Sequence, residues 1–305
     1  MFRKTVFILV ILLPLITSCK EKLFVSLRDT ISLDGSWKFA LDSAKVGIKE
    51  KWYAQSLSDS VKLPGTLDEN KKGILNTNRQ ETMRLSRELM YAGMAWYQKD
   101  VIIPENWKGQ HIRLMMERTK PTQVWVDTVL TGNSNDILTA QYYDLTTNLA
   151  PGKHSITILI NNSNSSVPGG ITGSHAWTEH TQSNWNGIIG KFCLEAANPA
   201  HIGSVQIYPD AEKKNVLVKV KIYNPEANSE KKKLILQVNA WNTELKHKIS
   251  PESFPITLKS GENTIELTYN MGNKIQLWSE FKPALYKLTI TLKGKKVLDN
   301  TTIDF

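Results

Sequence analysis

The stretch HTQSNWNGIIGKFCLEA, residues 180–196, joins a polar loop that carries tryptophan to an apolar strand. The loop reaches back to residue 168 and reads PGGITGSHAWTEHTQSNWNG. Indole rings offer flat faces for stacking on a sugar ring, and carboxylate, imidazole and amide groups bind its hydroxyls. The candidate sugar-binding residues are Trp177, Glu179, His180, Asn184, Trp185 and Asn186. For Trp185 the favoured interpretation is a core position, with the loop docking against a neighbouring domain.

No pattern in the sequence predicts a catalytic site. Acid–base cleavage of a glycosidic bond by the retaining route needs two carboxyl groups about 5–5.5 Å apart. The glutamates considered for such a pair are scattered among basic or apolar neighbours: Glu50, Glu69, Glu81, Glu88, Glu117, Glu179 and Glu195. His175 and His180 lack the partners of a zinc site, and Ser174 lies on a loop without the turn of an activated serine. We therefore predict no catalytic residue, no metal and no cofactor in this chain.

The N-terminus has the pattern of an export signal. Arg3 and Lys4 precede an apolar run from Val6 to Ile16, and the run ends in the sequence LITSC. Small residues directly before Cys19 resemble a bacterial lipobox, which predicts cleavage at that point and a lipid on the thiol. Residues 1–18 are then a signal peptide and residues 19–30 a tether. A plain signal peptide and an anchor helix are the alternatives.

Export of this kind predicts a membrane-anchored lipoprotein of a Gram-negative bacterium, in the periplasm or the outer membrane. The formal net charge is +9, and removal of Arg3 and Lys4 with the signal leaves +7. The basic residues are spread out apart from Lys231–Lys233, so nucleic acid is not an expected partner. Cys193 would be the remaining thiol, in an apolar strand, which predicts a buried side chain and no disulfide.

Alternating apolar and polar residues dominate the chain after the signal. Val216, Val218, Val220 and Ile222 share one face of an expected strand, and residues 154–160, 263–269 and 285–292 alternate in the same way. This period of two predicts half-buried antiparallel sheets and an all-β fold. The NPAHIG stretch at 198–203 interrupts the pattern. We expect a jelly-roll sandwich over residues 31–198 and an immunoglobulin-like sandwich of some seven strands over residues 199–305.

Six stretches, in order, resemble one family. They are SLDGSWKFAL at 32–41, LPGTLDENKKG at 63–73, the run from Tyr91 to Glu117, YDLTTNLAPGKHSITILINN at 143–162, WNGIIGKFCLEA at 185–196 and LWSEFKPALYKLTITL at 277–292. Together they are similar to the N-terminal domains of glycoside hydrolase family 2, the β-galactosidase, β-glucuronidase and β-mannosidase group. The resemblance covers roughly residues 30–305.

The resemblance implies a jelly-roll sugar-binding domain, an immunoglobulin-like domain and then a (β/α)8 barrel that carries the catalytic glutamates. This chain ends at TTIDF, where family members typically enter the barrel. The resemblance also implies that the loop before WNGI helps to wall the active site. In the β-galactosidases an Asn-Pro pair and an Asp contact the sugar. Ala92–Gly93 and roughly Thr181 occupy those places here, so the resemblance does not carry galactose specificity over.

Three functions remain open on the sequence. The chain is the non-catalytic N-terminal portion of a family 2 β-glycosidase, a stand-alone carbohydrate-binding lipoprotein, or a docking subunit for a separate barrel. Each predicts that the chain alone hydrolyses no glycoside. Core positions are expected for Trp37, Trp96, Trp278 and Tyr286.

Overall fold

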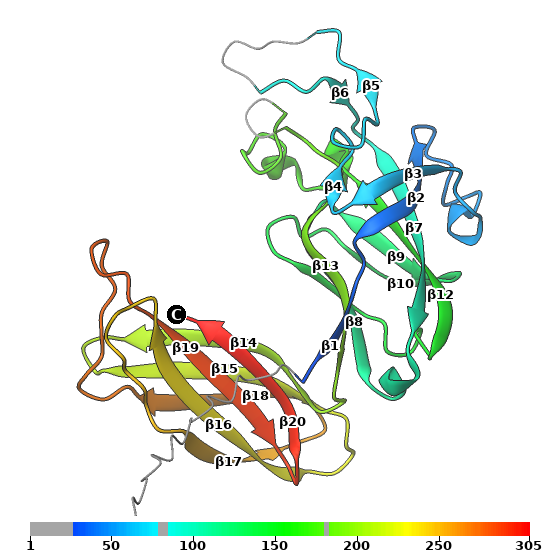
Figure 1. Ribbon diagram of the computed structural model, residues 1–305. Coiled ribbons are helices and arrows are strands. Elements are labelled where there is room, and N and C mark those ends of the chain that lie inside the picture. The colour runs from blue at the N-terminus through cyan, green and yellow to red at the C-terminus, as the bar shows by residue number, and fades with distance from the viewer. Residues whose placement is uncertain (1–26, 79–84, 180–182) are drawn as a thin grey trace, which may run out of the picture.

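A computed structural model describes residues 27–78, 85–179 and 183–305. Its strands form two bodies with separate hydrophobic cores, connected at Ala197–His201 (Figure 1). The described residues contain no α-helix, only four short 3-10 turns: Trp52–Ala54, Glu105–Trp107, Asn164–Ser166 and Gly169–Ile171. None of them is long and apolar enough to cross a membrane. The all-β prediction is confirmed. The predicted signal peptide and Cys19 lie outside the described residues.

Two antiparallel sheets face each other in the first body. One has the order β1 (Asp29–Ser32), β13 (Gly187–Ala197), β8 (His111–Thr119) and β11 (Gln141–Asp144), and the short β4 (Gly65–Thr66) also pairs with β13. The other has the order β10 (Val129–Ser134), β9 (Thr122–Val126), β12 (Gly152–Asn161), β7 (Met94–Ile103), β2 (Gly35–Asp42) and β3 (Asp59–Leu63). A small hairpin of β5 (Ile74–Leu75) and β6 (Leu89–Met90) projects from one end.

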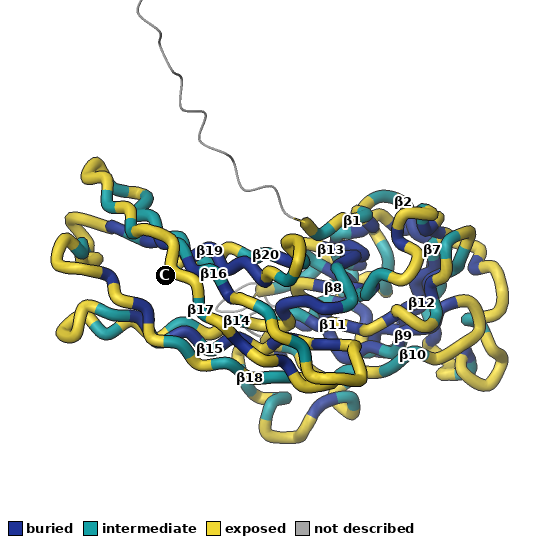
Figure 2. Tube along the Cα trace, turned by 90° about the horizontal axis from the view of Figure 1, so that it is seen from below, coloured by how far each residue is buried: buried dark blue, intermediate teal, exposed yellow. Residues whose placement is uncertain are grey.

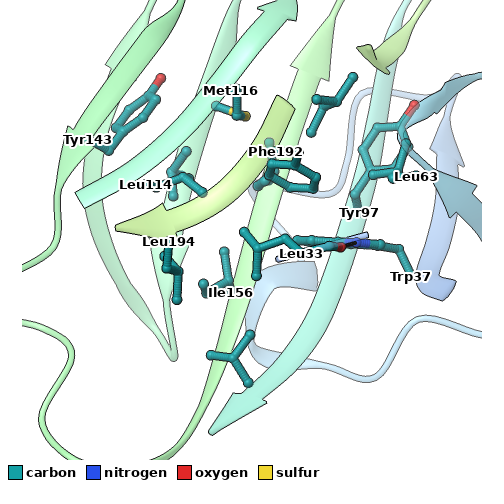
Figure 3. Packing of buried hydrophobic residues seen from close by; sticks show 14 of the residues in the cluster. Leu33, Trp37, Leu63, Tyr97, Leu114, Met116, Tyr143, Ile156, Phe192 and Leu194 are labelled. Carbon is teal, nitrogen blue, oxygen red and sulfur yellow. Dashed lines mark hydrogen bonds between the residues drawn. The ribbon is translucent and has the colours of Figure 1, made fainter. Parts of the chain in front are cut away.

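Side chains from both sheets fill the space between them (Figure 3). The Trp37 ring stacks on Phe192 with centroids 5.1 Å apart, and its indole N–H donates to the Leu33 carbonyl over 2.8 Å. The predicted core positions of Trp37 and Trp96 are confirmed, although Trp96 packs in a separate cluster with Trp125. Strands that alternate in sequence therefore bury one face against the opposite sheet.

Seven strands build the second body, all within described residues. One sheet holds β14 (His201–Asp210), β15 (Asn215–Asn224) and β18 (Gly261–Asn270), and the other holds β17 (Glu252–Leu258), β16 (Glu230–Trp241), β19 (Leu285–Lys293) and β20 (Val297–Asp304). Figure 2 shows buried segments within these strands and exposed residues in the turns. The faces predicted for Val216–Ile222 and Tyr286–Leu292 are buried as expected, and so is Cys193.

Trp278 is a correction to the predicted core. Its side chain is 61% exposed, since it lies in the irregular connection between β18 and β19 rather than on a strand. Leu277 and Phe281 on the same connection are also exposed. This end of the second body therefore presents apolar side chains to its surroundings.

Candidate functional site

The β5–β6 hairpin lies at one end of the first body (Figure 1). Residues of this hairpin line a hollow of about 730 Å³. The segment between β12 and β13 forms its second side, so the long loops expected from the sequence meet there. The wall offers many hydrogen-bonding groups: Asp42, Ser43, Lys45, Asn76, Thr77, Asn78, Arg87, Tyr91, Asn164, Thr172, Thr178, Glu179 and Asn184. Such a concave, polar wall can bind several hydroxyls at once.

Arg87 ties the two sides of the hollow together. Its Nε and Nη2 donate to the two carboxylate oxygens of Glu179 over 2.8 and 2.9 Å, and its Nη1 donates to Asp68 Oδ2 over 3.2 Å. A bidentate arginine–carboxylate pair fixes both side chains in direction. Glu179, a predicted sugar contact, is thus placed at the hollow but bound to a guanidinium. The sequence reasoning missed Arg87, for which no motif gives a signal.

Three asparagines close the base of the loop. Asn162 Oδ1 accepts from the Gly93 N–H over 2.9 Å and its Nδ2 donates to the Tyr91 and Asn184 carbonyls, each over 2.8 Å. Asn186 Oδ1 accepts from the Tyr97 hydroxyl over 2.7 Å. Asn186 is only 1% exposed, which corrects its prediction as a sugar contact, because a buried amide bound to core groups cannot reach a ligand.

Asn184 is buried as well, but it lines the hollow. Its Nδ2 donates to the Asn162 carbonyl over 2.7 Å, while its Oδ1 has no hydrogen-bond partner among the described residues. A buried acceptor without a donor costs free energy unless a ligand or water supplies one. Asn184 is therefore the predicted residue whose chemistry best fits a role at this wall.

Trp177 lines the hollow, but its ring is almost wholly buried, which does not favour the predicted stacking on a sugar. Trp177 is 1% exposed, its indole N–H donates to Asn164 Oδ1 over 2.9 Å, and Lys120 Nζ lies 4.6 Å from its ring centroid. Lys120 Nζ also lies 4.9 Å from the ring of Trp185, which is half-buried and does not line the hollow. His180 lies outside the described residues.

Lys120 is a second residue that the sequence reasoning missed. Its side chain is 3% exposed, and its Nζ contacts the Ala176 carbonyl at 3.5 Å. Burial, followed by repulsion from Arg118 and Arg87, lowers the pKa of Lys120 to about 8. The Lys120 ammonium group thus contacts the rings of Trp177 and Trp185 in the loop before β13. Indole faces attract cations, so these contacts stabilise the loop.

Charged groups beside the hollow are paired with one another. Asp68 and Glu179 both bind Arg87, Glu179 through both of its carboxylate oxygens and Asp68 through Oδ2. No group of three or more His, Cys, Asp or Glu suited to a metal occurs among residues 27–78, 85–179 and 183–305. The side chains at its wall can form hydrogen bonds to a polar ligand.

Comparison with known proteins identifies the family. The first body matches "Glycosyl hydrolases family 2, sugar binding domain" over residues 30–180, and the second matches "Glycosyl hydrolases family 2" over residues 200–305. The chain belongs to glycosyl hydrolase family 2. The resemblance of the six sequence motifs is thereby confirmed.

Known family 2 proteins are considerably longer than this chain. A β-glucuronidase of Paenibacillus borealis is 26% identical over 137 residues, which are 44% of this chain and 21% of that protein. A solved family 2 β-glucuronidase superimposes with a TM-score of 0.74 at 19% identity, over 93% of this chain and 31% of that one. The β-glucuronidase of Bacteroides uniformis gives 0.70 at 19% identity, over 91% and 32%. At these identities the solved structures establish the family 2 fold.

An apolar surface marks the far end of the second family 2 body. A hollow of about 180 Å³ is lined there by Leu277, Trp278, Tyr286 and Phe305 among others. Phe281 next to it is 86% exposed. Clustered exposed apolar side chains of this kind are typical of contact surfaces.

Proposed function

We propose that the chain is the non-catalytic, carbohydrate-binding N-terminal portion of a family 2 β-glycosidase, and that it works beside a (β/α)8 barrel. The observation that carries the proposal is the polar hollow of about 730 Å³ between the β5–β6 hairpin and the loop before β13. Its volume suits one or two sugar rings. Asn184 Oδ1 at its wall has no partner among the residues that the structure describes, which supports a ligand that donates a hydrogen bond.

The choice of sugar rests on the residues at the rim. Ala92 and Gly93, which occupy the place of the Asn-Pro pair of family β-galactosidases, line the hollow and offer no side-chain hydrogen bond. The relatives described above are named β-glucuronidases. We therefore propose a β-glycoside other than a galactoside as the preferred ligand, with β-glucuronides first among those to test.

A neighbouring barrel would supply what this chain does not offer. Leaving-group protonation and nucleophilic attack both require carboxyl groups at the reacting bond. The exposed Leu277, Trp278 and Phe281 provide apolar surface that such a neighbour can cover. A stand-alone binding lipoprotein would use the same hollow, but it would need no barrel to reach full affinity.

Binding to methyl β-glycosides tests the proposal. We expect a Kd in the millimolar range, about −4 kcal/mol, because an open hollow buries little of a monosaccharide. Ala92→Trp would fill the hollow and weaken binding at least tenfold, whereas Ala227→Trp, on an exposed turn of the second body, would leave it unchanged. No detectable binding at tens of millimolar, or equal binding by Ala92→Trp, would refute the proposal.

We also propose that a lipid on Cys19 holds the protein at a membrane of a Gram-negative cell, as the LITSC ending predicts. One acyl chain gives marginal binding, so stable anchoring requires more than one. Labelled palmitate should enter the wild-type chain and not Cys19→Ala. Equal labelling of the two would count against the anchor.

A further inference from the structure

The junction of the two bodies is built from charged and aromatic side chains. Arg28 precedes β1, and its Nε and Nη2 donate to the carboxylate oxygens of Asp299 on β20 over 3.0 and 2.6 Å. The same Asp299 accepts the N–H of Ile202 over 2.8 Å. Strand β1 of the first body is thereby connected to β14 and β20 of the second. Beside this ion pair, two imidazole rings meet face to face.

His111 begins β8 of the first body and His201 begins β14 of the second. Their ring centroids are 4.1 Å apart and the ring planes are inclined by 13°. His201 is 6% exposed and also contacts the Tyr223 ring at 5.7 Å. A hollow of about 460 Å³ lies beside the pair, so solvent can reach its margin. The stack is therefore a second direct contact between the two bodies, beside the Arg28–Asp299 pair.

The hydrogen bonds place a proton on Nδ1 of each ring, so a ring becomes charged only when its Nε2 takes up a second proton. His201 Nδ1 lies 3.0 Å from the Pro199 carbonyl, which only accepts, so this nitrogen carries the proton. His111 Nδ1 lies 3.1 Å from Thr146 Oγ1, whose own proton is donated to Asp144. Neither Nε2 has a hydrogen bond to a described side chain or carbonyl. Protonation of both Nε2 atoms would place two positive charges on rings that stack.

The surroundings do not offset that charge. Arg28 is paired with Asp299, and Arg113 on β8 is paired with Glu195 on β13 at 2.7 Å. On the side of the second body, Lys221 of β15 pairs with Glu262 of β18 at 3.0 Å. Asp144 on β11 lies 3.7 Å from His111 Nδ1 and is mostly exposed. It is the one carboxylate among these described groups without a lysine or arginine as partner, which is too little for two imidazolium ions.

We propose that the stacked His111–His201 pair is an acid-sensitive joint between the two bodies: it holds them in one arrangement near neutral pH and releases that arrangement in mild acid. Like charges at stacking distance repel, and the closed arrangement keeps water from both rings. Acidification would change the angle between the bodies and leave each sandwich folded. This inference does not depend on the sugar-binding proposal.

The direction of the pH effect follows from the pKa values. Burial first, and then the neighbouring His201, lowers the pKa of His111 to about 4, and burial also lowers the pKa of His201. Separated rings would return toward about 6.5. Between a pH of about 6.5 and about 4 the open form therefore binds more protons. The closed form is favoured fully above this window and is lost as the pH falls through it.

Small-angle X-ray scattering of the full chain at pH 7.5, 6, 5 and 4.5 tests the joint. We expect the radius of gyration to rise on acidification, while far-ultraviolet circular dichroism stays unchanged. His111→Phe combined with His201→Phe keeps two stackable rings without a titrating group and should remove the response. His154→Gln is the matched control, because His154 bonds Asp127 within the first body. This control should respond as the wild type does.

Two results would overturn the joint: a wild-type scattering profile that is constant to pH 4.5, or a response that survives in the double phenylalanine variant. If that variant fails to fold, proton NMR of the wild-type imidazoles decides instead. Supporting data would show the two rings titrating below pH 6.5 together with the scattering change. Titration of either ring without that change would refute the proposal.

Discussion

At the scale of single residues, burial and pairing decide which polar groups remain available. Arg87 binds both carboxylate oxygens of Glu179, and Tyr97 donates to Asn186. Asp68 and Asn184 each keep one oxygen without a hydrogen-bond partner among the described residues. The sequence alone does not show which of these side chains is available to a ligand, because it does not give their contacts. Lys120 shows the same point for a cation, since two indoles surround an ammonium that burial disfavours.

Lys120 should make stability depend on alkaline pH. Its pKa is lowered from 10.5 to about 8 in the folded chain, so between these values the unfolded chain binds the extra proton. The free energy of unfolding of the wild type should therefore rise relative to Lys120→Met between pH 7.5 and 10, by up to about 3 kcal/mol. Urea unfolding at the two pH values measures this difference.

The exposed Lys38 provides the control for this titration. Lys38→Met should give the same difference from the wild type at both pH values. A Lys120→Met difference that does not move with pH would show that the ammonium is not desolvated by the two tryptophans.

At the scale of elements, period-two alternation predicted strands and their buried faces well. Ile156, Ile158 and Ile160 all enter the core because a strand turns alternate residues to the same side. Loop residues were predicted poorly, since a loop has no period from which direction can be read. Trp177 folds inward and Trp278 points outward for that reason, both against expectation.

The start of β13 requires a glycine, and this local requirement is visible in the sequence at Gly187. Gly187 has φ +136°, and a Cβ there would lie 2.2 Å from the Gly65 carbonyl oxygen of β4. Gly187→Ala should therefore lower the free energy of unfolding through two effects. Backbone strain costs about 1–3 kcal/mol, and the clash costs a similar amount. Thermal unfolding monitored by circular dichroism would report the loss.

Gly152 is the matched control, because its φ is +131° and a Cβ added there would have no described atom within 4 Å. Gly152→Ala should lower the free energy of unfolding by the backbone strain alone. Equal losses at the two positions would mean that the close approach of β13 to β4 is not what requires glycine.

At the scale of the whole molecule, two separate cores are joined at a short connection and an ion pair. Both cores follow from apolar residues that alternate within strands, so the sequence predicts them. The junction between the two bodies cannot be predicted from the sequence, because Arg28 and Asp299 are 271 residues apart and neither belongs to a motif. The hollow cannot be predicted from the sequence either, since residues far apart in the chain form its walls. Arg87 and Glu179 are an example.

The Arg28–Asp299 pair should hold the N-terminal segment and β14 onto β20. Asp299 is 1% exposed, so Arg28→Met would leave a buried carboxylate with the Ile202 N–H but without its cation. Loss of one partner of a buried pair costs about 3–5 kcal/mol, and the partial exposure of Arg28 favours the lower end. Arg118→Met, at an exposed position on β8, should change stability by no more than about 0.5 kcal/mol. Urea unfolding followed by tryptophan fluorescence separates the cases, and equal midpoints for the two variants would show that the ion pair does not stabilise the junction.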